Sequence, residues 1–313
     1  VAYAVDRLLS GPAARRAPEN GEAAHSRNPI AKSEGRADAE RERRAGIHTL
    51  VCASEGNHGR AVARVARERS LHAIVYMRRS AAQARVDAIR DEGADVVLVD
   101  GTYDDAVKLV AGKAEGTRGV TIVSDTAWPG YEGIPRAIMA GYTWIMTEAA
   151  RQWAPHPPDI VIVQAGVGGL AAAVASWLAA RLHPRPFFIC AEPTGAACVR
   201  AAIAAGRAAS LVPEDTIMNG LRCGEVSSLA LPVLLATVDA SVLVDDQSAI
   251  EAVEQFRNPC GADAPIEAGA SGACGLAALS AWSRALPVAP GSRAFIINTE
   301  GTTDPARYAR RGA

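Results

Sequence analysis

A run of apolar residues leads into a glycine-rich turn near the middle of the chain. Val161 to Gln164 is typical of a buried strand, and Gly166, Gly168 and Gly169 precede an alanine-rich helix. Glycine lets main-chain N–H groups turn inward, and with the helix dipole these groups can bind a phosphate. The spacing fits neither a dinucleotide nor a nucleoside-triphosphate motif. A tight strand–helix turn without a ligand remains the alternative for this motif alone.

A second turn of small and polar residues follows another predicted strand. Residues 54–60 read Ser-Glu-Gly-Asn-His-Gly-Arg and open a helix. Side chains and backbone can both face a ligand at such a turn. An ordinary helix N-cap by Asn57 would give the same pattern. A lone histidine such as His58 is more often a structural hydrogen-bonding residue than a catalytic base.

Three further segments of polar residues lie at predicted strand ends or in glycine-containing loops. Asp125 ends a predicted strand just before Trp128 and Tyr131, and desolvation beside aromatic rings would raise the pKa of its carboxyl group toward that of a useful base. Alternatively, Asp125 caps the next turn. The other two segments are 216–225, which contains Gly220, and 297–305, which contains Thr299.

Alternating strands and helices position these turns. Hydrophobic patterning predicts strands at 50–53, 72–77, 95–99, 120–124, 159–164, 187–191, 241–244 and 294–298, and helices at 60–70, 80–93, 102–114, 132–153, 169–182, 195–206, 227–238, 246–257 and 270–285. Repeated strand–helix–strand units predict an α/β fold with parallel sheets. We expect a helix end and a polar surface segment over 1–47, a small lobe over 48–130 and a large lobe over 131–313. Ligands bind at the carboxyl ends of strands in such sheets, which is where the glycine-rich turns lie.

Composition excludes several classes of protein. The 313 residues are 49% hydrophobic and carry a formal net charge of −1, which argues against a nucleic-acid-binding protein. No apolar run is long enough to span a membrane, and the first residues lack a secretory signal pattern. The six cysteines are scattered, which predicts no zinc site or disulfide framework and indicates a reducing cytoplasm.

Taken together and in order, the five segments resemble the pyridoxal-phosphate enzymes of the tryptophan-synthase-β type (fold type II). Within that group they are similar to the diaminopropionate ammonia-lyases. The segments that carry the resemblance are Gly-Asn-His-Gly-Arg at 56–60, Asp-Thr-Ala-Trp at 125–128, Gln-Ala-Gly-Val-Gly at 164–168, Thr-Ile-Met at 216–218 and Thr-Glu-Gly at 299–301. The likeness covers almost all of 48–313. Serine and threonine dehydratases share the first and third motifs.

The resemblance implies two open parallel-sheet lobes with helices on both faces and a cofactor cleft between them. It implies that pyridoxal 5′-phosphate is held through its phosphate by Gly166, Val167, Gly168, Gly169 and Leu170. Asn57 would hydrogen-bond the 3′ oxygen of the ring, Thr299 would face the ring nitrogen, and Gly220 would line a ring face. Asp125 would approach the amino groups or the α-carbon of the substrate.

The implied reaction is α,β-elimination of a small amino acid, which turns 2,3-diaminopropionate into pyruvate and ammonia. A neutral hydroxyl opposite the ring nitrogen leaves that nitrogen largely unprotonated. The cofactor is then a weaker electron sink, so prompt loss of the β-amino group competes well. The resemblance also implies a homodimer. A serine or threonine dehydratase, or a relic that binds the cofactor without catalysis, are the alternatives.

Two positions depart from the family pattern. Glu55 stands where the family has an aspartate implicated in acid–base chemistry, and a displacement of about 1 Å can cost roughly 10²-fold in rate. The family also needs a lysine that binds the cofactor covalently. Val1 to Ala4 resembles the end of the segment that carries this lysine, so we expect it upstream of Val1. Lys32, Lys108 and Lys113 are poor substitutes, because their surroundings resemble solvated surface.

Overall fold

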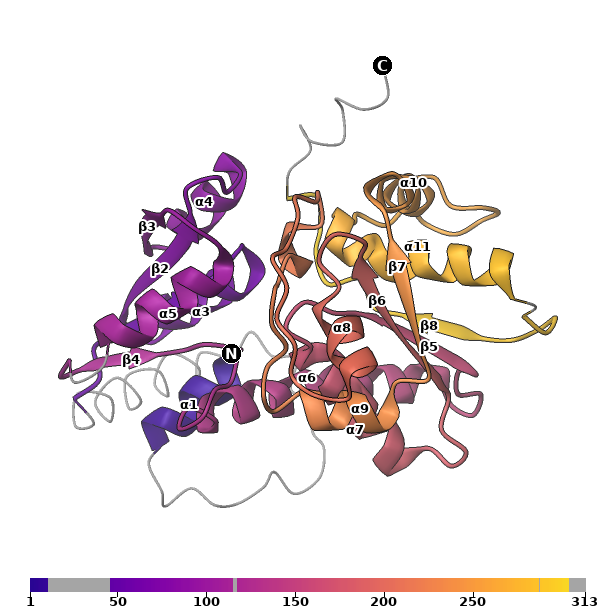
Figure 1. Cartoon of the computed structure of the whole chain (residues 1–313), viewed down its shortest axis with the longest axis horizontal. Helices are drawn as coiled ribbons and strands as arrows, with labels where there is room; N and C mark the ends of the chain where they lie inside the picture. The colour runs from indigo at the N-terminus through magenta and orange to yellow at the C-terminus, as the bar shows by residue number, and fades with distance from the viewer. Residues whose placement is uncertain (11–45, 115–116, 287, 304–313) are drawn as a thin grey trace, which may run out of the picture. The chain divides into compact units, whose positions relative to one another are not determined.

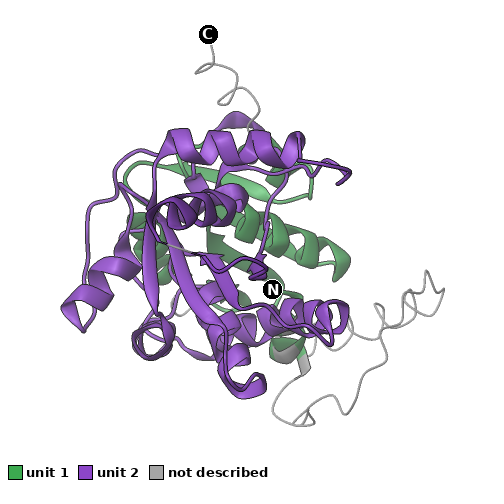
Figure 2. Cartoon of the chain, turned by 90° about the vertical axis from the view of Figure 1, so that its right-hand side faces the viewer, with its two compact units in different colours: residues 1–81, 86–124 green, residues 82–85, 125–313 purple. Residues whose placement is uncertain are grey.

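A computed structural model describes residues 1–10, 46–114, 117–286 and 288–303 (Figure 1). The chain divides into two compact units (Figure 2). Unit 1 comprises Val1–Ala81 and Val86–Ser124, and unit 2 comprises Ala82–Arg85 and the chain from Asp125 onward. In the described residues, no helix is both long and apolar enough to cross a membrane.

Unit 1 is built on a four-stranded parallel sheet in the order β3-β2-β1-β4. Its strands are β1 (Thr49–Ala53), β2 (His72–Arg78), β3 (Asp95–Val99) and β4 (Val120–Ile122), and its helices are α1 (Ala2–Ser10), α3 (Asn57–Glu68), α5 (Tyr103–Ala114) and most of α4 (Gln83–Arg90). Every residue of the central strand β1 is buried, as expected for a parallel sheet covered by helices. Gly59 lets α3 pack closely, because a Cβ there would lie 2.7 Å from Val75 Cγ1.

Unit 2 repeats this architecture with the strand order β7-β6-β5-β8. Its strands are β5 (Ile160–Gln164), β6 (Phe187–Pro193), β7 (Ala240–Val244) and β8 (Ala294–Ile296). Its helices are α6 (Gly133–Trp153), α7 (Gly169–Arg181), α8 (Cys198–Ala205), the 3-10 turn η1 (Asn219–Leu221), α9 (Leu231–Thr237), α10 (Asp246–Arg257) and α11 (Ala270–Ala285).

The core of unit 2 lies between its sheet and α10 and α11. Ile162 and Ile189 pack there against alanines of both helices, such as Ala252 and Ala273. Side chains alternate along a strand, so Val161 and Val163 face the opposite side of the sheet, where α7 lies (Figure 1). Helices on both faces leave the strand ends as the place where polar residues collect.

The predicted series of strands and helices and the parallel sheets are confirmed. The largest differences are at helix ends: α3 begins at Asn57 rather than 60, α8 at Cys198 rather than 195 and α9 at Leu231 rather than 227. Helix α4 spans Gln83–Arg90 rather than 80–93. Pro232 stands in the first turn of α9, where its missing N–H costs no hydrogen bond. The predicted polar segment over 11–46 lies, except for Gly46, outside the described residues.

Candidate active site

The turn that follows β5 requires glycine at two positions. Gly168 has a φ of +88°, and a Cβ there would lie 2.8 Å from Leu234 Cδ1. A Cβ on Gly166 would lie 3.1 Å from Cys223 Sγ and 3.2 Å from the carbonyl oxygen of Gly220. The chain therefore passes close to the segment around η1, and Gly166 and Gly220 are neighbours.

Helix α7 begins directly at this turn with free backbone donors. Its first internal hydrogen bond runs from Ala172 N to Gly168 O at 2.9 Å, so the N–H groups of Gly169, Leu170 and Ala171 have no acceptor inside the helix. Within the described part of the chain, no side chain caps this end, and its first turn holds no acidic residue. These donors and the positive end of the helix dipole suit an anion such as a phosphate.

Ser227 fastens the segment that carries Asp125 to the glycine turn. The fully buried Ser227 accepts a hydrogen bond from Ala127 N through its Oγ at 3.0 Å. Its own N–H donates to Val167 O at 2.9 Å. A Cβ on Gly169 would lie 3.8 Å from the carbonyl oxygen of Asp125. Asp125 and the glycine turn are thus brought together in unit 2.

Tyr142 of α6 is a further polar side chain near Asp125. Burial, reinforced by the negative charge of Asp125, raises the pKa of Tyr142 above its ordinary value. The phenol is therefore neutral at physiological pH and keeps its proton. The two aromatic residues that the sequence pointed to, Trp128 and Tyr131, stack on one another with ring centroids 4.2 Å apart.

Thr299 and Gly220 are held by side chains of neighbouring elements. Gln164 Nε2, at the end of β5, donates to Thr299 Oγ1 at 2.8 Å. The Gly220 N–H donates to Ser271 Oγ at 3.1 Å at the start of α11. Glu300, beside Thr299, accepts from Ser271 N at 3.1 Å and pairs with Arg85 at 3.5 Å, so its charge is neutralised inside unit 2.

The turn after β1 lies in unit 1, and a serine side chain holds it. Ser54 Oγ accepts from the N–H groups of Gly56 at 3.0 Å and Gly59 at 2.8 Å. The N-cap of α3 is Gly56, so an N-cap by Asn57 is wrong: Asn57 is the first helical residue, and its side chain is exposed. His58 Nε2 donates to Val123 O at 2.7 Å, which makes it a structural hydrogen-bonding residue.

Glu55 is buried, and one arginine binds both of its carboxylate oxygens. Arg78 Nε and Nη2 donate to the two carboxylate oxygens of Glu55, each at 2.7 Å. The side chains of Glu55 and Arg78 are only 8% and 7% exposed. A bidentate pair of this kind fixes the direction of the carboxylate.

The comparisons with known proteins agree with this geometry. Residues 32–300 match the family of pyridoxal-phosphate dependent enzymes. Diaminopropionate ammonia-lyase of Escherichia coli K12 is 35% identical over 273 residues, which cover 83% of this chain and 68% of that protein. The chain belongs to the diaminopropionate ammonia-lyase family. It is a pyridoxal-phosphate-dependent ammonia-lyase of fold type II.

Other relatives of the lyase show how far the similarity extends. A crystal structure of the Escherichia coli enzyme in complex with an aminoacrylate–PLP azomethine reaction intermediate has a TM-score of 0.77 and 34% identity, and covers 84% of this chain and 70% of that one. A biosynthetic L-threonine dehydratase of Mycobacterium leprae is 30% identical over 265 residues, or 83% of this chain and 58% of that protein. A fungal L-serine ammonia-lyase at 21% identity shares the fold, with a TM-score of 0.74.

The residues of unit 2 fit pyridoxal phosphate. The N-terminus of α7 offers backbone donors without a competing carboxylate. Beside it, Gln164 Oε1 is buried with no hydrogen-bond partner among the described residues, and the side chain of Thr299 is exposed. A polar ligand at this edge of the sheet would reach donors and acceptors of both kinds. The two lysines that the structure describes, Lys108 and Lys113, are exposed on α5 of unit 1, as the sequence predicted.

Several residues that hold the candidate residues within each unit were missed from sequence. Ser227, Tyr142 and Arg78 all lie outside the motifs with which they interact. Ser227 is the first residue of a predicted helix, and nothing in the local sequence distinguishes it from other helix starts. Arg78 is the last residue of β2, and Glu55 follows the end of the neighbouring parallel strand β1 by two residues. Two opposite charges at adjacent strand ends were a usable signal.

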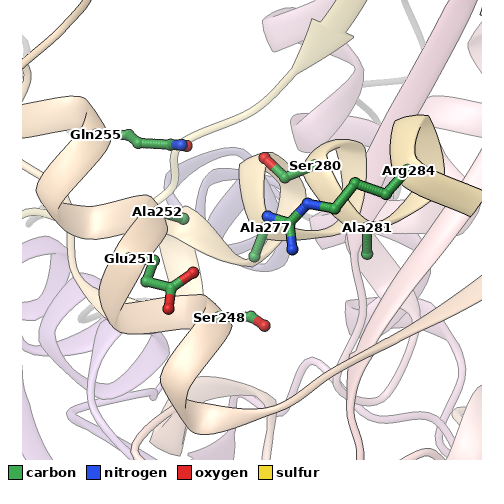
Figure 3. Close-up of a pocket in the computed structure, with 8 residues that line it drawn as sticks. All are labelled: Ser248, Glu251, Ala252, Gln255, Ala277, Ser280, Ala281 and Arg284. Carbon is green, nitrogen blue, oxygen red and sulfur yellow. The ribbon is translucent and has the colours of Figure 1, made fainter.

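Unit 2 also contains a pocket that none of the motifs touches. It lies between α10 and α11, and polar side chains such as Ser248, Glu251, Ser280 and Arg284 line it (Figure 3). It holds none of the candidate residues and is not part of the candidate site.

Proposed function

We propose that the enzyme catalyses the α,β-elimination of 2,3-diaminopropionate. One water molecule is consumed, and pyruvate and two molecules of ammonia are released. The observation that carries the proposal is the link through Ser227, because it keeps the Asp125 segment beside a turn that suits a phosphate. The 35% identity to diaminopropionate ammonia-lyase supports the same substrate.

In this proposal separate groups of the chain hold the phosphate, the ring nitrogen and the 3′ oxygen of the cofactor. When bound, pyridoxal phosphate supplies an electron sink for the negative charge that develops at the substrate α-carbon. The N–H groups of the turn 166–170 bind the phosphate. Thr299 donates to the ring nitrogen, and Asn57 hydrogen-bonds the 3′ oxygen. Gly220 presents no side chain and leaves room for a ring face.

Asp125 is the proposed acid–base residue, either accepting the α-proton or holding an amino group of the substrate. Its side chain is partly exposed, so a substrate can reach it. Glu55 is the second proposed acid–base group. Because Arg78 binds both of its oxygens, Glu55 acts from a fixed orientation rather than as a mobile base.

A serine or threonine dehydratase activity is the second candidate, and the 30% identity to an L-threonine dehydratase favours it. Loss of a β-hydroxyl and loss of a β-amino group need the same electron sink, so substrate recognition decides between them. A dehydratase would produce pyruvate from serine and 2-oxobutyrate from threonine.

The test compares the three substrates with the purified enzyme. The protein is produced as its gene encodes it, with any residues that precede Val1, because the family resemblance predicts the cofactor lysine there. We expect the highest kcat/KM with 2,3-diaminopropionate, and two molecules of ammonia for each pyruvate. A higher kcat/KM with serine or threonine would contradict the proposal. Borohydride reduction followed by mass spectrometry locates the lysine, and analytical ultracentrifugation tests the homodimer that the resemblance implies.

A further inference from the structure

Gln164 stands at the junction between β5 and the glycine turn with its amide group buried. The residue is 3% exposed. Its Nε2 donates to Ile297 O at 2.9 Å and to Thr299 Oγ1 at 2.8 Å. Both contacts bridge β5 to the chain that follows β8, its parallel neighbour in the sheet.

The direction of these hydrogen bonds is fixed by chemistry. The carbonyl oxygen of Ile297 can only accept, so the atom that faces it must be the amide nitrogen and not the amide oxygen. The two hydrogens on Nε2 then serve Ile297 O and Thr299 Oγ1. Thr299 is therefore the acceptor in its contact with Gln164, and its own hydroxyl proton is not used there.

The hydroxyl proton of Thr299 is left for an acceptor on the exposed side. Gln164 approaches from the buried side, whereas the side chain of Thr299 is exposed. No acceptor for this proton lies within hydrogen-bond distance among the residues that the structure describes. The two chain neighbours of Thr299 are engaged elsewhere: Asn298 Nδ2 donates to Glu267 O, and the Glu300 carboxylate binds Ser271 N and Arg85.

We propose that Gln164 is a positioning residue that keeps the Thr299 hydroxyl as a hydrogen-bond donor to the ring nitrogen of pyridoxal phosphate. The proposal rests on the proposed function, which assigns Thr299 to that nitrogen. A donor hydroxyl requires a nitrogen with a free lone pair, so Gln164 favours the unprotonated ring. An acceptor at position 164 would instead use up the hydroxyl proton and leave only lone pairs facing the ring.

The test measures the protonation of the ring nitrogen directly. Pyridoxal phosphate labelled with ¹⁵N in the ring is bound to the full-length enzyme without substrate, and its ¹⁵N chemical shift is recorded. We expect the shift of an unprotonated, hydrogen-bonded pyridine. Gln164→Glu should move it toward the pyridinium value above the pH at which the new carboxyl group ionises. Gln164→Met, which only removes the donor, should move it less and weaken cofactor binding roughly threefold to tenfold.

Two controls separate this role from general disturbance. Gln255→Glu adds the same charge at an exposed position on α10 and should leave the shift unchanged. Thr299→Ser keeps the hydroxyl and should also leave it unchanged. Gln164 acts through the Thr299 hydroxyl, which Thr299→Val removes. Adding Gln164→Met to Thr299→Val should therefore change the ¹⁵N shift no further. This comparison still decides the question if Gln164→Glu fails to fold.

The outcomes distinguish the positioning role of Gln164 from the assignment of Thr299 to the ring nitrogen, on which that role rests. A shift that responds to Thr299→Val but to neither Gln164 variant would overturn the role of Gln164 and leave Thr299 at the ring nitrogen. A shift that ignores Thr299→Val would overturn both. Turnover of serine rather than diaminopropionate would refute the proposed substrate and leave the ¹⁵N result intact.

Discussion

Ser227 Oγ accepts a hydrogen bond from Ala127 N at 3.0 Å, and this bond joins two segments that are 100 residues apart in the chain. The N–H of Ser227 donates to Val167 O, so one serine holds both the loop after Asp125 and the glycine turn. The glycine turn and the segment of the candidate acid–base residue are therefore joined through one buried residue, by its hydroxyl on one side and its N–H on the other.

Replacing this hydroxyl should damage both stability and catalysis. Ser227→Ala leaves the buried Ala127 N–H without its acceptor, which costs about 1–3 kcal/mol in the free energy of unfolding. We also expect a lower kcat/KM, because the Asp125 segment loses its attachment. Denaturant unfolding and steady-state kinetics measure the two effects. Ser228→Ala is the matched control, since Ser228 is exposed, and an equal effect of both variants would contradict the role of Ser227.

The glycine turn can be tested at Gly168. Gly168→Ala should cost roughly 1–2 kcal/mol for the left-handed backbone and more for the contact with Leu234 Cδ1 at 2.8 Å. Cofactor affinity, measured by fluorescence titration, should fall by about tenfold or more, because a shift of about 1.4 kcal/mol is one decade. Gly206→Ala is the control: its φ is +63° with nothing within 4 Å of the added Cβ. Unchanged cofactor affinity in Gly168→Ala would refute the assignment of this turn.

The fold, and the places of the turns that make up the candidate site, were predictable because they depend on local patterns. Strands such as Asp95–Val99 are short apolar runs between turn residues, and each of the glycine motifs lies directly after a strand or beside a helix start. Parallel topology then brings the strand ends to one edge of each sheet. Thr299 and Gln164 meet for this reason, since β5 and β8 are neighbours.

The remaining features depend on contacts that no local pattern encodes. Ser54, and not Asn57, accepts backbone N–H groups at the start of α3, because Gly56 lets the chain turn so that Ser54 Oγ meets the N–H groups of Gly56 and Gly59. Tyr142 is near Asp125 only because α6 packs within unit 2 in one particular way. Such choices follow from tertiary packing, which one sequence read locally does not reveal.

The pair of Glu55 and Arg78 should be strongly coupled. Arg78→Met takes away the guanidinium that binds both oxygens of a buried carboxylate, which costs about 3–5 kcal/mol in the free energy of unfolding. Glu55→Gln takes away the negative charge that faces this guanidinium. The double variant should be clearly more stable than the sum of the two single effects predicts. Urea unfolding of the four proteins measures the coupling, and simple additivity would show that the two side chains act independently.

Asp125 can be tested by comparing substrates. Asp125→Asn should lower kcat with diaminopropionate by roughly 10²-fold or more if the carboxylate accepts the α-proton. Serine, which lacks the β-amino group, should then lose activity to the same extent. If Asp125 instead holds the β-ammonium group, KM for diaminopropionate should rise while serine is little affected. Kinetics with unchanged kcat and KM on both substrates would exclude Asp125 from the reaction.

Glu192 should give the lyase a stability that falls as the pH rises. Burial, partly opposed by hydrogen bonds from the N–H groups of Val199 and Arg200, raises the pKa of Glu192 to about 7. The folded state therefore holds this proton more tightly than the unfolded chain, where the pKa is near 4.5. The stability that the proton contributes is complete below the unfolded pKa and is lost as the pH rises from about 4.5 to 7, by about 3 kcal/mol.

Glu192→Gln removes the titrating group and should flatten this part of the pH profile. The measurement is the free energy of unfolding at a series of pH values, from urea titrations of both proteins. Glu225→Gln serves as the control, since it removes a carboxylate at an exposed position of unit 2. It shows whether the loss of any one carboxylate flattens the profile. A wild-type profile that stays flat between pH 5 and 7, or one that Glu192→Gln leaves unchanged, would mean that water reaches the Glu192 carboxylate in the folded protein.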